Sequence, residues 1–81
     1  MARRVRIVER KLKRERAVGR VFLDEGVIEI EARQEPREWL STLVHEALHV
    51  AFPAMGEKSI AAAEKKIADI LWRAGVRRVY Q

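Results

Sequence analysis

Apolar and polar residues alternate over the first third of the chain with the period of two that is typical of β-strands. The clearest alternation covers residues 27–32, where Ile28, Ile30 and Ala32 share one face and Glu29 and Glu31 share the other. Residues 18–23 form a second apolar segment, and the short link between the two ends at Gly26, which can adopt a positive φ. The pattern therefore predicts a β-hairpin.

The segment before the hairpin, residues 3–9, also alternates, with Val5 and Ile7 separated by arginine. A helix that uses Val5, Val8 and Leu12 fits the same residues, because the period of so short a segment does not separate the two structures. We favour the strand, and we expect a three-stranded antiparallel sheet with one apolar face.

From Pro36 onward the apolar residues recur with the period of an α-helix. Proline suits the first turn, where its missing N–H has no helical partner. The apolar half of this helix consists of Trp39, Leu40, Leu43, Val44, Ala47, Leu48 and Ala51. His45 and His49 fall on the other half. We expect the helix to bury its apolar half on the sheet and to turn its histidines towards a cleft or a second helix.

Residues 53–56 contain a proline and a glycine and mark a turn. A second helix is predicted from Glu57 or Lys58 to Arg73, ended by Gly75 at its C-terminus. The residues after Gly75 form a tail or a short terminal strand. The fold class that follows is α+β, with a small antiparallel sheet packed against the histidine-bearing helix and a second, antiparallel helix.

The composition is that of one small soluble domain covering residues 1–81. A chain of this length is near the lower limit for folding on a hydrophobic core alone, and a bound metal is one common source of additional stability. The chain has no cysteine, which excludes disulfides and thiolate ligands. No apolar segment has the length of a membrane span, and no signal peptide is visible, so we expect a cytoplasmic protein.

Positive charge is concentrated at the N-terminus. Residues 1–20 carry nine Lys/Arg and two Glu, a net charge of +7, and the other residues carry eight Lys/Arg and ten Asp/Glu, a net charge of −2. The simplest interpretation is an edge strand whose charges prevent aggregation. A basic segment of this kind can also bind nucleic acid, although no aromatic residue lies among its charges to stack on bases.

His45, Glu46 and His49 form H-E-x-x-H, the spacing that zinc hydrolases use. Histidines four residues apart lie one helical turn apart on one face, so both imidazoles can reach one ion. A carboxylate would complete a site with an open position for water. We favour Glu64, which interrupts the apolar stripe of the second helix, and Glu57, two turns earlier, stays open as the alternative.

The same motif predicts how the site would act. Zinc lowers the pKa of a bound water, and Glu46 can accept the proton of that water as it attacks a peptide carbonyl and later deliver it to the leaving amine. Glu38, earlier on the same helix, is a candidate for orienting a histidine.

Residues 26–72 resemble the core of the zincin metallopeptidases, and the likeness depends mainly on His45, Glu46 and His49. It is greatest to the gluzincin branch, in its minimal single-domain forms and in the ImmA/IrrE-type peptidases. Two features depart from these families. The interval from His49 to either candidate glutamate is shorter than in most gluzincins, and no separate lower subdomain closes a substrate cleft.

The resemblance implies one zinc ion, a peptide substrate and Glu46 as the general base. It further implies that the strand before the active-site helix pairs with extended substrate by β-augmentation, which would involve Val27, Ile28, Glu29 and Ile30.

The function expected from the sequence is therefore that of an intracellular zinc metallopeptidase, a hydrolase that cleaves peptide bonds. Two alternatives remain. One is a zinc-stabilised binding module whose basic N-terminal segment contacts nucleic acid or a protein partner, and the other is an inactive zincin-fold subunit. A homodimer is compatible with the small size of the domain.

Overall fold

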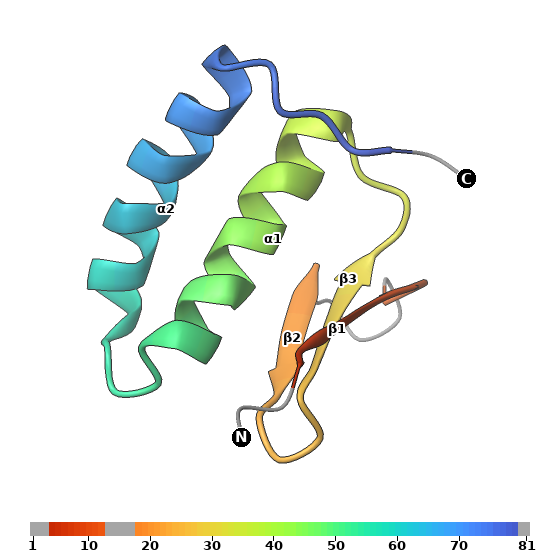
Figure 1. The fold of residues 1–81 in the computed structure, drawn as a ribbon, viewed down its shortest axis with the longest axis vertical. Helices are drawn as coiled ribbons and strands as arrows, with labels where there is room; N and C mark the ends of the chain where they lie inside the picture. The colour runs from red at the N-terminus through yellow and green to blue at the C-terminus, as the bar shows by residue number, and fades with distance from the viewer. Residues whose placement is uncertain (1–3, 13–17, 80–81) are drawn as a thin grey trace.

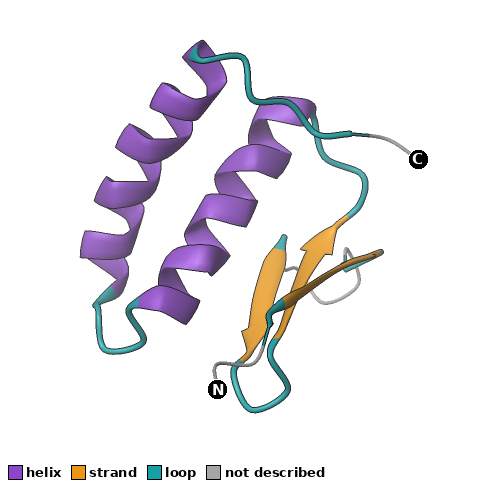
Figure 2. Cartoon of the chain, viewed as in Figure 1, coloured by secondary structure: helices purple, strands orange, loops and turns teal. Residues whose placement is uncertain are grey.

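A computed structural model describes residues 4–12 and 18–79 of the chain and confirms the α+β class (Figure 1). The elements are β1 (Arg6–Arg10), β2 (Gly19–Phe22), β3 (Val27–Glu31), α1 (Pro36–Ala51) and α2 (Glu57–Arg73). Both helices lie on the same side of the sheet, and α1 lies between the sheet and α2 (Figure 2). Neither helix is long and apolar enough to cross a membrane.

The sheet is mixed, with the strand order β1-β3-β2. Strands β2 and β3 form the predicted antiparallel hairpin, and Gly26 ends its turn with a φ of 64°. Strand β1 pairs with β3 in parallel, so the prediction of a fully antiparallel sheet was wrong. A parallel neighbour needs a long connection, and residues 11–26, which include β2 itself, provide one.

Strand β3 is the centre of the sheet, and all five of its residues are buried. Glu29 and Glu31, predicted on the face opposite Ile28 and Ile30, are therefore buried as well. Glu29 forms ion pairs of 2.6 Å with Arg10 and with Arg20, one from each neighbouring strand. The Glu31 carboxylate accepts hydrogen bonds from the backbone N–H of Leu12 and of Arg33. These lengths are 2.7 and 2.8 Å. The burial is tolerated because each carboxylate is compensated.

Helix α1 has two buried faces rather than one. Leu40, Val44 and Leu48 form the main apolar core with Ile60 and Ala68 of α2. The expectation that the whole apolar half of α1 packs on the sheet was wrong, since these three leucine and valine side chains face α2 and Ala47 and Ala51 remain exposed. Trp39, of the same half, donates a hydrogen bond to Glu9 of β1.

The second buried face of α1 contains Thr42 and Glu46, and it lies against β2. Gly19 makes this approach possible. A Cβ at position 19 would lie only 2.7 Å from Thr42 Cγ2 and 3.0 Å from Glu46 Oε2. Because α1 lies between the sheet and α2, it has one buried face towards each. The face towards β2 contains the polar residues Thr42 and Glu46, which the apolar pattern of the helix did not mark as buried.

Helix α2 begins at Glu57 and ends where predicted. Gly75 has a φ of 90°, its N–H bonds the carbonyl of Trp72, and the N–H of Val76 bonds the carbonyl of Leu71. This is the Schellman pattern that a C-terminal glycine favours. Residues 76–79 form no strand, and Tyr80 lies outside the described residues.

Candidate metal centre

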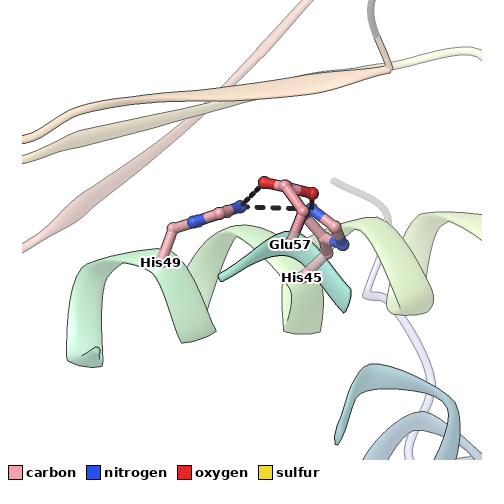
Figure 3. Close-up of side chains that lie close together, drawn as sticks. All are labelled: His45, His49 and Glu57. Carbon is pink, nitrogen blue, oxygen red and sulfur yellow. Dashed lines mark hydrogen bonds and ion pairs between the residues drawn. The ribbon is translucent and has the colours of Figure 1, made fainter. Parts of the chain in front are cut away.

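The two histidines of α1 present their imidazoles to one point. His45 and His49 are half-buried, their ring centroids lie 4.9 Å apart, and their Nε2 atoms are 3.3 Å apart. Figure 3 shows both rings directed towards the same space, with Glu57 reaching it from the start of α2. The two histidines thus share one face of α1, as their spacing predicted, and two imidazole nitrogens at this separation can bind one cation.

Glu57 completes a group of three potential ligands. Its Oε1 lies 2.7 Å from His49 Nε2, and its Oε2 lies 3.5 Å from His45 Nε2. One ligand atom from each of the three residues lies within 4.8 Å of the others. The short turn between the helices places Glu57 here, because it makes α2 start beside the last turns of α1 (Figure 1).

Glu64 occupies a different position from the one that we favoured. Its Oε1 lies 2.7 Å from His45 Nδ1, on the side of the ring opposite the atom that faces Glu57. A carboxylate in this position fixes the tautomer and the orientation of a metal-binding histidine. The geometry thus places Glu57 among the potential ligands and Glu64 behind His45. Glu38, considered for the orienting role, is exposed near the start of α1.

Glu46 is buried beside this group, and its residue surface is only 8% exposed. It lines a pocket of about 290 Å³ together with Gly19, His45 and Glu64. Among the described residues, none donates a hydrogen bond to its carboxylate. Burial raises the pKa of Glu46, the charges of the two histidines oppose this increase, and the charges of Glu57 and Glu64 add to it. A carboxylate with a raised pKa that faces a pocket beside two histidines is the arrangement expected of a proton acceptor.

The donor set fits zinc. Two imidazole nitrogens and one carboxylate oxygen are the ligands of many catalytic zinc sites, which leave one coordination position open. Glu57 is the most exposed of the three, with 73% of its side chain accessible, so the group can be reached from solvent.

The structure corrects the predicted substrate-binding strand. Val27, Ile28, Glu29 and Ile30 belong to β3, whose main chain is paired with β1 on one side and with β2 on the other. An extended peptide therefore cannot add to it. The strand that borders the pocket is β2, and among the described residues no strand pairs with its outer edge. Sequence reasoning missed Gly19, although a glycine inside a strand is a recognised sign of close approach.

Neither a scan against protein-family models nor searches of curated proteins and of solved structures found a match. The zincin resemblance therefore stays a prediction.

Proposed function

We propose that this protein is a minimal zinc-dependent peptidase that acts in the cytoplasm. The observation that carries the proposal is the convergence of His45, His49 and Glu57 beside Glu46, which lines the same pocket as His45. A structural metal site needs only the first three residues. The fourth, Glu46, faces the pocket beside them, where a carboxylate can act as a proton acceptor, and this position favours catalysis.

Each residue has a distinct role in the proposal. His45, His49 and Glu57 would hold the ion, and zinc when bound supplies Lewis acidity and a lowered water pKa. Glu46, facing the pocket, accepts a proton from the attacking water and returns it to the leaving amine. Glu64 contacts the Nδ1 atom of His45, and the Nε2 atom of the same ring is directed at Glu57 and His49. The pocket beside Glu46 provides a place for the scissile bond.

The experiment that tests catalysis is the variant Glu46→Gln. We expect it to fold and to bind zinc as the wild type does, because its side chain has the same shape and is not among the ligand atoms. Cleavage of a fluorescence-quenched peptide library should fall by about 10²–10⁴-fold, the usual contribution of a general base. The matched control is Glu38→Gln, an exposed glutamate of the same helix, which should keep both properties.

Two results would contradict the proposal. One is a wild-type protein that binds zinc but cleaves no peptide of the library, which would favour a zinc-stabilised binding module or an inactive subunit. The other is unchanged cleavage by Glu46→Gln, which would remove the assigned proton acceptor.

A further inference from the structure

The sheet has a second face, directed away from both helices, that the proposed peptidase site does not use (Figure 2). Gly19 of β2 contacts α1, and Glu9 of β1 accepts a hydrogen bond from Trp39 of α1. Side chains alternate along a strand, so the neighbours of these two residues project to the opposite side. Those neighbours include Arg10 and Arg20, and their shared ion pairs with Glu29 confirm that all three are on one face.

We define the outer sheet face as Arg6, Arg10, Arg20, Phe22 and Arg33. Arg6 and Phe22 both pair with Val27 and alternate in register with Arg10 and Arg20. Arg33 extends from the end of β3 and bonds the carboxylate of Glu31 on this same side. Among the described residues no helix covers this face.

The outer sheet face is positively charged. Its four arginines are opposed by two buried glutamates, Glu29 and Glu31, which leaves a net charge of +2. The side chains of Arg10 and Arg33 are 59% and 52% exposed, although each contacts a glutamate. The glutamates lie beneath Arg10 and Arg33 and hold them in position. A guanidinium has five N–H donors, and one contact with a carboxylate does not use all of them.

An aromatic ring lies among these charges. Phe22 is 37% exposed, and the guanidinium of Arg20 lies 5.4 Å from the centre of its ring. Phe22 lies just after the basic segment of residues 1–20, so that segment alone contains no aromatic residue. The folded sheet brings the ring beside the arginines. Arginines around an aromatic platform are the combination that binds phosphates and stacks on unpaired bases.

The two sides of the molecule differ in charge. The metal centre gathers Glu46, Glu57 and Glu64, whereas the outer sheet face gathers arginines. A polyanion would therefore be repelled from the first region and attracted to the second.

We infer that the outer sheet face binds single-stranded nucleic acid, with arginines on the phosphates and a base on Phe22. A duplex fits less well, because its bases are stacked on one another and are not available to the ring. The inference does not depend on the peptidase proposal, since the two sites share no residue.

The test is fluorescence anisotropy of a labelled single-stranded oligonucleotide over a range of salt concentrations. Wild-type protein should bind, and log K should fall with log salt by about 0.7 for each phosphate contact. Arg6→Gln/Arg33→Gln should reduce this slope by about 1.4 for two lost contacts and weaken binding at low salt. The control Lys65→Gln/Lys66→Gln removes the same charge from the exposed side of α2 and should leave the slope unchanged.

The variant Phe22→Leu tests the stacking contact and leaves the arginines in place. It should weaken binding by about tenfold, within the range measured for base–aromatic contacts, without changing the salt slope. Circular dichroism of each variant confirms that the fold is retained.

Three results would overturn the inference. These are no binding by the wild type at low salt, equal losses in the outer-face and control variants, and competition by polyglutamate as effective as that by unlabelled oligonucleotide. The last result would show that the face accepts any polyanion, including an acidic protein. His45→Ala/His49→Ala should bind the oligonucleotide as the wild type does, so failure of the metal site leaves this test unaffected.

Discussion

At the scale of single residues, the buried carboxylates of this chain divide into two kinds. Glu29 and Glu31 are paired with arginine or with backbone N–H groups, and they hold neighbouring segments together. Glu46 is as deeply buried but has no such partner among the described residues. The first kind stabilises the sheet, and the second faces the pocket beside the histidines, where we propose that it acts as a proton acceptor.

Glu31 gives the fold a defined sensitivity to acid. The backbone N–H of Arg33 is the main cause that lowers the pKa of Glu31 from 4.5 to about 2, and the Arg33 side chain and the Leu12 N–H add to it. A carboxyl group whose pKa is lower in the folded state stabilises the protein at any pH above its unfolded-state pKa. This stability is lost as the pH falls towards the folded-state pKa. We expect urea midpoints of the wild type to decrease between pH 4.5 and about 2.

The variant Glu31→Gln should be less stable at neutral pH and should lose much of this dependence. Glu25→Gln, in the exposed turn of the hairpin, is the control and should follow the wild type. A Glu31→Gln curve parallel to that of the wild type through the acid range would show that the contacts of Glu31 do not stabilise the fold.

At the scale of elements, the contact between β2 and α1 determines the shape of the candidate site. We expect Gly19→Ala to destabilise the fold by about 1–3 kcal/mol, the range for overpacking, because its Cβ would meet Thr42 and Glu46 at 3.0 Å or less. Gly56→Ala is the matched control, since a Cβ there meets nothing within 4 Å. Equal urea midpoints for the two alanine variants would show that β2 does not approach α1 so closely.

The elements themselves could be predicted from sequence, but their arrangement could not. The hairpin and both helices depend on local signals such as Gly26, Pro36 and Gly75, which act within a few residues. Strand order does not leave such a signal, because alternation is the same in parallel and antiparallel pairs. The burial of Glu29 follows from the central place of β3, which depends on distant residues.

The candidate site shows the same division. The spacing of His45 and His49 fixes their common face, so their proximity could be predicted. The choice between Glu57 and Glu64 depends on the register of α2 against α1, which is set by the turn and by packing in the core. Two turns of helix separate Glu57, the possible ligand, from Glu64, which contacts the far side of the His45 ring.

At the scale of the whole molecule, Arg78 ties the end of the chain to its beginning. Its guanidinium donates to the carbonyl of Ala32, pairs with Glu9 of β1 and lies over the ring of Trp39 in α1. Its side chain is only 11% exposed. One residue thus joins the first strand, the end of the sheet and the first helix.

We expect Arg78→Ala to lower the free energy of unfolding by about 1.5–3 kcal/mol, the range for hydrogen bonds to a charged group. The control is Arg73→Ala, whose side chain is 76% exposed and whose ion pair with Asp69 is 3.6 Å long. This control should change the stability by about 0.5 kcal/mol or less. Urea denaturation measures both, and similar small losses would show that the C-terminal contacts do not stabilise the domain.

The central claim is that His45, His49 and Glu57 form a zinc site. The most direct test is metal analysis of protein purified without chelators, together with zinc titration of the metal-free protein. We predict one zinc per chain, its loss in His45→Ala and in His49→Ala, and a larger loss of affinity in Glu57→Gln than in Glu64→Gln. The latter should weaken binding by about 10–100-fold, as expected of a residue that orients a ligand. A wild type without stoichiometric zinc, or full zinc retention in His45→Ala/His49→Ala, would contradict the claim.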